Sequence, residues 1–581
     1  MSILKELIED IKKDIKEAGY EVENPAIEPS NRRDLGEYQL NDAMQLVKTY
    51  HENPRVIAEK ISKAMENDDR FENINIAGPG FINFSLSKKY SIEILNRMNK
   101  DIFENIDKKD YKKIIIDYGG ANVAKALHVG HLRSANLGEA LKRLARTLGY
   151  EVLGDAHLGD YGRPLGLVIT EIKKMYPELP YFDETYQGNY EELTLPITNE
   201  DLERIYPLAS NKAKEDEDYL EEARIITNKF QDHEKGYYEL WKKIVEISKE
   251  DIKKTYDTLN TEFDIWNGES DEMEYFDELI EICKNKNVLT ESEGAQVIEV
   301  AEEKETSPMP PLIIVKTNGS KSYDSTDLAT ILERERNHHP DEIWYVVDGR
   351  QGLHFEQEFR AARKIDLVPK TTILEHIGFG TMNGKDGKPF KTRDGGVMTL
   401  KNLIEIVKEE TLNKINNESI KEEDREKVAM DVAIAAIKYA DFLSFRATDY
   451  VFEVEKFSDL EGKTGPYLLY STIRMKSLLN KAEDMKKEEV KDLVGTEKDI
   501  ILTLLELPTV LNKALETKSM NDIAEFLYNL TSNYNKFYAE NKILTEENED
   551  LRESWLALTN IVYKVNSMLL EILGIKVPEK M

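Results

Sequence analysis

A short apolar run, followed by a loop and a long helical pattern, constrains the fold of this chain more than any other feature. Residues 114–118 read IIIDY, which is typical of a buried parallel strand, and residues 131–149 have helical spacing. Residues 150–153 predict a second strand. This order of elements opens a nucleotide-binding α/β fold, whose ligands bind beyond the carboxyl ends of the strands. We therefore expect a site in the loop after residue 118.

That loop carries two histidines at its end, in the segment 121–131, which reads ANVAKALHVGH. His128 and His131 are three residues apart, so both side chains can face the same phosphates around one helical turn. A helix N-terminus also offers free N–H groups to a phosphate. Gly130 leaves room for a flat base to lie on the backbone. The alternative is two surface histidines at a helix start, which the spacing alone does not exclude.

A second candidate segment, residues 384–396, reads GKDGKPFKTRDGG and holds three lysines, one arginine and four glycines. A glycine-rich loop with lysines can close over a triphosphate and stabilise the charge that develops during a reaction. Lys388 and Lys391 are the candidate contacts. The alternative is a solvated hairpin loop.

The remaining patterns predict an α/β protein of several domains. A helix and the turn-rich strand 76–84 indicate an N-terminal α+β domain over 1–108. A Rossmann-like parallel-sheet domain follows over 109–401, with an acidic helical insertion at about 170–310. Residues 311–315 and 342–347 resume its strands. From 402 the pattern is helical, with a connecting segment over 402–465 and a helical bundle over 466–581.

Composition excludes several classes of protein. The single cysteine, Cys283, cannot form an internal disulfide or a cysteine zinc cluster, so we expect no zinc and a buried thiol. No window approaches the roughly 20 apolar residues of a membrane span, and the N-terminus lacks the features of a signal peptide, which predicts a cytoplasmic protein. The net charge of −32 requires any nucleic-acid surface to be locally basic.

The two candidate segments together resemble the HIGH and KMSKS motifs of class I aminoacyl-tRNA synthetases. They stand here as HVGH at 128–131 and as a degenerate KPFKT at 388–392. The longer segment 117–134 resembles the arginyl-tRNA synthetases in particular, although Gly119 and Gly120 stand where that family has Ser-Pro or Ser-Ser-Pro before the asparagine. Further blocks similar to that family recur in order along the chain: 36–38, 41–47, 77–83, 157–162, 268–270, 293–295, 323–327, 349–351, 391–393, 465–470 and 573–581. One block departs from the family at Arg163-Pro164, where Thr-Gln is usual.

The resemblance assigns roles to individual residues. It implies catalytic roles for His128, His131, Lys125 and Lys391, and ATP contacts for Gly130, His131, Lys388 and Lys391. It implies arginine contacts for Asp117, Asn122, His128, Glu269, Tyr323, Asp327 and Gln351. A planar, always charged guanidinium calls for carboxylates in its plane, which suits Glu269 and Asp327. Tyr323 and Asp327 are four residues apart and share a helix face; a helix-start cap with a packed tyrosine is the alternative.

The resemblance also implies partners. These are L-arginine, ATP with Mg²⁺, and tRNA(Arg), which members of the family typically need before they activate arginine. The candidate tRNA contacts are Asn83, Tyr467, Tyr470, Arg474, Lys476 and Met581. We expect a monomer that does not bind membranes. Two alternatives stay open: another class I synthetase, such as the cysteinyl or methionyl type, and a catalytically inactive synthetase-like tRNA-binding protein.

Overall fold

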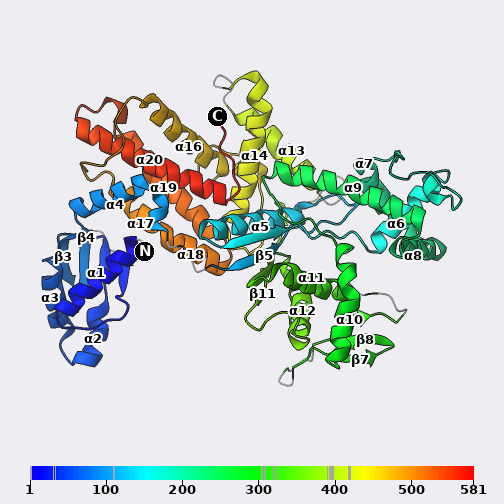
Figure 1. Ribbon diagram of the computed structural model, residues 1–581. Helices are drawn as coiled ribbons and strands as arrows, with labels where there is room; N and C mark the ends of the chain where they lie inside the picture. Colours follow the sequence, from blue (N-terminus) through cyan, green and yellow to red (C-terminus); the bar gives the residue numbers. More distant parts are fainter. Residues whose placement is uncertain are drawn as a thin grey trace.

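The computed structural model describes residues 3–581 apart from 31, 33, 107, 109–110, 303–304, 306–308, 318–320, 322, 389, 391–397 and 416–419. The side chains of residues 3–4, 104–105 and 323–324 also lie outside the described part. Figure 1 shows a central sheet around β5, with the N-terminal elements (blue) at one end and the helices α6–α9 at the other. The C-terminal helices α16–α20 lie between the N-terminal elements and the central sheet.

The N-terminal elements form an antiparallel sheet of order β1-β2-β4-β3 that is covered by helices. Asn53 caps α3 through its side chain, and Pro54 starts that helix, where a missing N–H costs nothing. The elements are α1 (Ile3–Glu17), β1 (Ile27–Pro29), β2 (Tyr38–Leu40), α2 (Asp42–Tyr50), α3 (Pro54–Met65), β3 (Phe71–Ala77), β4 (Phe81–Leu86) and α4 (Lys88–Lys100). Helix α4 packs on α20, which joins this unit to the C-terminal helices.

The central sheet is parallel, with the order β11-β10-β5-β6. Its strands are β5 (Lys113–Asp117), β6 (Glu151–Asp155), β10 (Glu342–Tyr345) and β11 (Ile373–His376). The order reverses between β5 and β10, and in open parallel sheets the crevice at such a reversal binds ligands. The register sets Tyr345 beside Asp117, and Asp117 beside Asp155. The carboxyl ends of three strands therefore meet at one level.

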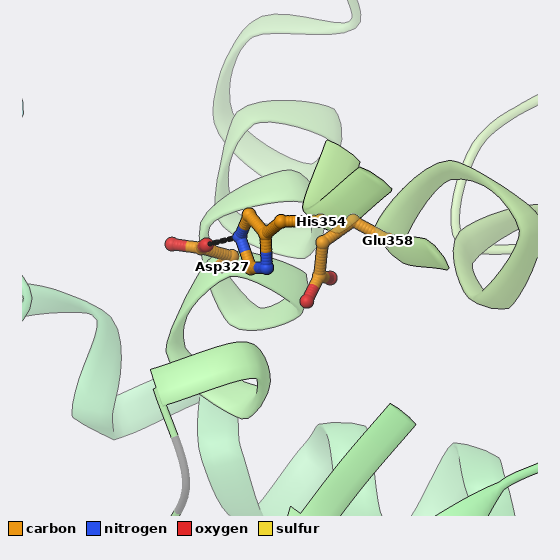
Figure 2. A group of neighbouring side chains, drawn as sticks. All are labelled: Asp327, His354 and Glu358. Carbon is orange, nitrogen blue, oxygen red and sulfur yellow. Dashed lines mark hydrogen bonds and ion pairs between the residues drawn. The ribbon is translucent and has the colours of Figure 1, made fainter. Parts of the chain in front are cut away.

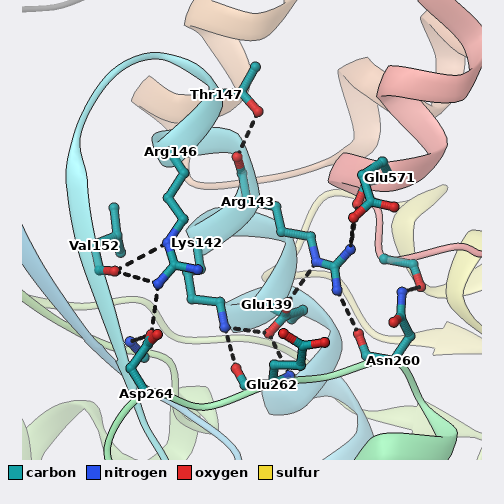
Figure 3. A network of polar contacts seen from close by, with 12 residues as sticks. Glu139, Lys142, Arg143, Arg146, Thr147, Val152, Asn260, Glu262, Asp264 and Glu571 are labelled. Atoms are coloured by element: carbon teal, nitrogen blue, oxygen red, sulfur yellow. Dashed lines mark hydrogen bonds and ion pairs between the residues drawn. The ribbon is translucent and has the colours of Figure 1, made fainter.

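Helix α5 (Val129–Thr147) connects the central sheet to the rest of the molecule. It contacts α13, α14, α18 and α20, and most of its side chains are buried. Figure 3 shows a polar network along its second half, where Glu139 pairs with Lys142 at 3.0 Å and with Arg143 at 2.6 Å. Arg143 also pairs with Glu571 near the end of α20. The helix that begins with the two histidines is thus tied to the last helix of the chain.

One predicted strand lies in a different sheet from the one expected. Residues 312–315 form β9, which pairs with β8 in an antiparallel sheet of order β7-β8-β9 rather than continuing the parallel sheet. Its side chains alternate, since Leu312 and Ile314 are buried while Ile313 is exposed. Such alternation suits a strand with one solvated face, whereas parallel strands such as β5 are buried throughout. The insertion therefore ends in a small sheet of its own.

Most of the insertion, of the segments around the central sheet and of the C-terminal third is helical. The insertion and small sheet contain α6 (Arg163–Met175), α7 (Asn199–Glu215), α8 (Glu217–Gln231), α9 (Lys235–Thr258), η3 (Asp271–Tyr275), α10 (Phe276–Asn285), β7 (Leu289–Ser292), β8 (Ala295–Ile298) and β9 (Leu312–Val315). The next elements are α11 (Tyr323–His338), η4 (Gly349–Gln351), α12 (Gly352–Lys364), β12 (Met382–Asn383), α13 (Leu400–Lys414), α14 (Arg425–Phe442), β13 (Tyr450–Val451) and α15 (Val454–Phe457). The C-terminal bundle consists of α16 (Gly465–Lys481), α17 (Lys498–Leu505), α18 (Leu507–Thr517), α19 (Asn521–Glu540) and α20 (Glu549–Ile572).

Two predictions from composition can be compared with the described residues. Cys283 lies on α10 and is fully buried in the core beside α11, as expected, and burial raises the pKa of its thiol to about 11. Within the described part of the chain, no helix has both the length and the apolar character needed to cross a membrane.

Candidate active site

The two histidines cap the start of α5 and fix each other. The His128 Nδ1 atom accepts a hydrogen bond from the Gly130 N–H at 3.0 Å, and the His131 Nδ1 atom accepts one from the His128 N–H at 3.1 Å. Their rings lie 4.0 Å apart. Because each Nδ1 is an acceptor, each neutral ring carries its proton on Nε2. Burial lowers the pKa of His128, and lowers that of His131 to about 3, so both rings are neutral donors at pH 7.

Glycine at 119 and 130 is explained by the backbone around them. Gly119 has φ +72°, and a Cβ there would lie 2.8 Å from the Phe263 ring. Its N–H donates to the Ser134 hydroxyl at 2.7 Å, which in turn donates to the Val346 carbonyl at 2.6 Å. A Cβ at Gly130 would meet the His128 ring at 2.7 Å. The glycine that stands at 119, where this chain departs from the arginyl-tRNA synthetase pattern, therefore matches a left-handed backbone that favours glycine.

A buried arginine occupies the base of the site. Arg334 of α11 is fully buried and donates through Nη2 to Asp117 and to Asp155, at 2.6 Å each. The two carboxylates raise the pKa of Arg334 further above its usual range. Asp117, predicted to contact arginine, thus has one of its oxygens engaged by a residue that the sequence patterns did not single out.

Glu269 and Asp327, the two carboxylates predicted to contact a guanidinium, are near enough for Asp327 to raise the pKa of Glu269. The Glu269 N–H donates to the Leu158 carbonyl at 3.0 Å, which places this residue beside the loop after β6. Burial, with Asp160 and Asp327 nearby, raises the pKa of Glu269 to about 7. Burial also raises the pKa of Asp327. Two neighbouring carboxylates repel each other, and a cation bound between them stabilises the ionised form of both.

The other predicted arginine contacts lie at the same edge of the sheet. Asn122 is exposed and forms a backbone bridge to Gly159. Gln351 is exposed at the end of η4, in the segment that follows β10. Tyr323 begins α11 one turn before Asp327, but its side chain lies outside the described residues.

The three lysines predicted to bind phosphate lie in different parts of the chain, and two of them are described in the structure. Lys125 lies near the histidines, and its ammonium group lies 4.5 Å from the centre of the Tyr206 ring of α7. Lys388 is exposed in a turn, where its N–H donates to Asp386 at 3.1 Å and its carbonyl accepts from Gly384 at 2.8 Å. Lys391 lies outside the described residues.

The site contains further polar residues that the sequence analysis did not assign. His157 lies in the loop after β6, with Nε2 at 3.4 Å from the Thr330 hydroxyl of α11. His354 of α12 contacts Asp327 at 2.6 Å between Nε2 and Oδ2. Glu272 is fully buried in η3, which raises its pKa to about 8. The block HLGDYG at 157–162 was the signal for His157, whereas His354 and Glu272 stand in ordinary helical patterns.

The predicted tRNA contacts divide by exposure. Tyr470 is 47% exposed on α16, and the Arg474 guanidinium lies between Tyr470 and Tyr538, at 5.9 and 4.8 Å from the two ring centres. The Tyr467 hydroxyl accepts from Asn535 at 2.8 Å. Lys476 and Met581 are half-buried. Asn83 is only 1% exposed, and its Oδ1 accepts from the Ser30 hydroxyl at 3.3 Å, so the structure places it inside the N-terminal sheet.

A parallel sheet with capping histidines at the switch point, and a helical bundle beside it, define a class I aminoacyl-tRNA synthetase. The family model "tRNA synthetases class I (R), catalytic domain" matches residues 93–454. Flanking it, "Arginyl tRNA synthetase N terminal domain" matches 4–86 and "DALR anticodon binding domain" matches 468–581. The chain belongs to the arginyl-tRNA synthetase family, and it is a ligase of the arginine–tRNA type.

Relatives and solved structures support this assignment over the whole length. The chain is 41% identical to an arginine–tRNA ligase of Agathobacter rectalis, with 99% of this chain and 98% of that protein covered. It is 42% identical to one of Alkaliphilus oremlandii, with the same coverage. The arginyl-tRNA synthetase structure from Plasmodium falciparum aligns with a TM-score of 0.77 at 26% identity over 99% of both chains. The alternative of another class I synthetase is therefore excluded.

Proposed function

We propose that the carboxyl edge of the central sheet holds arginine and ATP side by side and catalyses both steps of arginyl-tRNA formation. In the first step the arginine carboxylate attacks the α-phosphate of ATP, giving arginyl-adenylate and pyrophosphate. In the second step the 2′-hydroxyl of the terminal adenosine of tRNA(Arg) attacks the acyl carbon and releases AMP. The buried Glu269, with Asp327 close enough to raise its pKa, carries the choice of arginine, because a bound guanidinium relieves the repulsion between the two carboxylates.

The residues divide the work between the two substrates. Glu269 and Asp327 pair with the guanidinium, with Tyr323 on the same helix face as Asp327. Asn122, Gln351 and His128 orient the amino and carboxylate groups of arginine, since an amide both donates and accepts. Asp117 lies beneath them.

The ATP phosphates are placed at the start of α5. His131 presents its Nε2–H there as a neutral donor, and the free N–H groups of the helix add to it. Gly130 leaves space for the nucleotide. Lys125, Lys388 and Lys391 supply positive charge that stabilises the pentavalent phosphorus, so positioning and charge carry the step. Mg²⁺ accompanies ATP and is held mainly by phosphates and water.

The tRNA is proposed to span the molecule from the N-terminal unit to the bundle. Tyr470 and Arg474 offer an exposed ring and a guanidinium to unpaired anticodon bases, which stack on such groups. Tyr467, Lys476 and Met581 are the other proposed contacts with the tRNA. The proposed domains are 1–108, 109–401 with an insertion at about 170–310, 402–465 and 466–581. We further propose that the protein works as a cytoplasmic monomer.

Arginine-dependent exchange of pyrophosphate into ATP tests this function directly. We expect exchange with arginine only when tRNA(Arg) is present, and none with lysine, methionine or cysteine. A protein that binds tRNA(Arg) but shows no exchange with arginine would be the inactive tRNA-binding alternative.

The tRNA surface has its own test. Tyr470→Ala is expected to raise the KM for tRNA about tenfold, because stacking on one base contributes roughly 1–3 kcal/mol, and to leave the KM for arginine unchanged. Tyr563→Ala, in the half-buried part of α20, is a control for effects on the bundle.

A further inference from the structure

His354 lies between two carboxylates, Glu358 and the proposed arginine contact Asp327. Asp327 comes from α11, whereas His354 and Glu358 lie one turn apart on α12. The His354 Nε2 atom is 2.6 Å from Asp327 Oδ2, and one ligand atom from each of the three residues lies within 4.8 Å of the others. Figure 2 shows the imidazole between the two acids, with the second oxygen of Asp327 turned away from it.

This contact determines what Asp327 can offer a substrate. One carboxylate oxygen, Oδ2, is engaged by the imidazole, which leaves Oδ1 for a guanidinium N–H. The hydrogen bond and the partial charge of His354 also lower the pKa of Asp327, in opposition to the burial that raises it. An ionised Asp327 is needed because a protonated carboxyl loses both its charge and one acceptor.

The surroundings of His354 hold its ring in one orientation. Its side chain is only 16% exposed, and Glu358 is 1% exposed one turn further along α12. Phe355 contacts the His354 ring edge-to-face at 5.3 Å and stacks on His376 at 4.8 Å. A histidine that bonds a carboxylate on one side and faces another on the opposite side has both its tautomer and its ring plane fixed.

We propose that His354 is a positioning residue for arginine: held between Asp327 and Glu358, it fixes the Asp327 carboxylate with Oδ1 directed at the guanidinium. The inference rests on the proposed function, because it assumes that Asp327 binds arginine. His354 itself does not touch the substrate. Its removal therefore affects the binding of arginine and leaves ATP binding intact.

The same three side chains could instead hold a metal ion, so the experiment separates these cases. In a metal site the imidazole and both carboxylates converge on one cation, and arginine binding depends on that ion. In a positioning role, arginine binding to the protein as purified is unchanged when a transition-metal chelator is added, with Mg²⁺ kept in excess for ATP.

Two substitutions of His354 test the proposal. Loss of a hydrogen bond to a charged group is expected to raise the KM for arginine about 10- to 100-fold in His354→Ala. Glutamine can place its Nε2 donor near that of histidine, so His354→Gln is expected to lie within about fivefold of the wild type. The KM for ATP stays the same in both. His338→Gln, at the far end of α11, is the matched control and behaves as wild type.

Four outcomes decide the matter. A rise in the arginine KM that is specific to alanine and largely recovered by glutamine supports the proposal. Equal rises in the KM for arginine and ATP, together with a lower unfolding temperature, would show a purely structural role. Loss of arginine binding on chelation would reveal a metal site. If the wild-type protein shows no arginine-dependent exchange with tRNA(Arg), the proposed function fails before the role of His354 is reached.

Discussion

Arg334 of α11 bonds Asp117 at the end of β5, with its Nη2 atom 2.6 Å from the Asp117 Oδ2 atom. The same nitrogen is 2.6 Å from Asp155 Oδ2 at the end of β6. The two strands are neighbours in register at these residues. One buried cation therefore bridges two carboxylates that would otherwise repel each other at the carboxyl edge of the central sheet.

Replacement of Arg334 is expected to destabilise the catalytic unit. Arg334→Met leaves Asp117 and Asp155 buried without their cation, and breaking a buried pair costs about 3–5 kcal/mol. Urea unfolding followed by circular dichroism measures the loss. Arg336→Met is the control, because Arg336 is 51% exposed and pairs with Glu278 at the surface. A loss no greater than the control's would show that the cluster tolerates two unpaired carboxylates.

Arginine binding is expected to weaken as the pH falls below 7. The pKa of Glu269 is raised to about 7 and that of Asp327 is also raised, whereas a bound guanidinium favours the ionised form of both. Below pH 7 the free enzyme holds a proton on Glu269 that arginine must displace. The KM for arginine should therefore rise up to about tenfold per pH unit and be constant above pH 8.

The matched variant for this pH dependence is Glu269→Gln, which cannot titrate. Its KM for arginine should be higher than that of the wild type at pH 8 but vary less between pH 8 and pH 6. The KM for ATP, measured at each pH, serves as the internal reference. An unchanged pH dependence in Glu269→Gln would assign the titration to another group.

His131 is expected to act through its Nε2 proton. His131→Asn keeps an oxygen that can accept from the His128 N–H, but its shorter side chain has no donor at the position of the histidine Nε2. The kcat for exchange should therefore fall about 100- to 1000-fold, as for loss of one oxyanion donor. Because the pKa values of both histidines are lowered, kcat at saturating arginine should stay flat from pH 8 to pH 6. A decline of kcat with an apparent pKa near 6.5 would show that a histidine titrates there.

Gly119 is expected to tolerate no side chain. A Cβ would meet the Phe263 ring at 2.8 Å on a backbone with φ +72°, so Gly119→Ala should cost about 2–4 kcal/mol from strain and overpacking combined. Gly462→Ala is the control for strain alone, since Gly462 has φ +80° with open space around it, and should cost about 1–2 kcal/mol. Equal losses in the two variants would show that Phe263 moves aside.

Sequence patterns predicted the elements that depend on local order. The strand at 114–118 and the helix after it were placed within two residues, because periodicity and β-branched runs are local signals. The helix begins at Val129 rather than His131, since a histidine takes the capping place that Ser, Thr, Asp or Asn usually fills. Residues 312–315 were predicted as a strand and form β9, but the sheet that β9 joins is set by its pairing with β8, which is not a local signal.

The site residues that the sequence missed are joined by long-range contacts. Arg334 pairs with Asp117 across 217 positions, and His354 reaches Asp327 from the next helix. Neither has a motif, because each works through one partner and not through spacing. Asn83 shows the opposite case: it stands in a recognisable block, and the antiparallel pairing of β4 buries its side chain. Burial of single strand residues follows from register, which the sequence alone does not fix.

Asp327 and Glu269 are proposed to bind the guanidinium of arginine, and the KM values of Asp327→Ala are the sharpest test of that role. The assay is arginine-dependent exchange with tRNA(Arg) present. The KM for arginine should rise at least about 100-fold, because the bound guanidinium loses its ion pair with Asp327. The KM for ATP should change by less than about threefold. Equal changes in the two KM values would contradict the assignment of Asp327 to arginine.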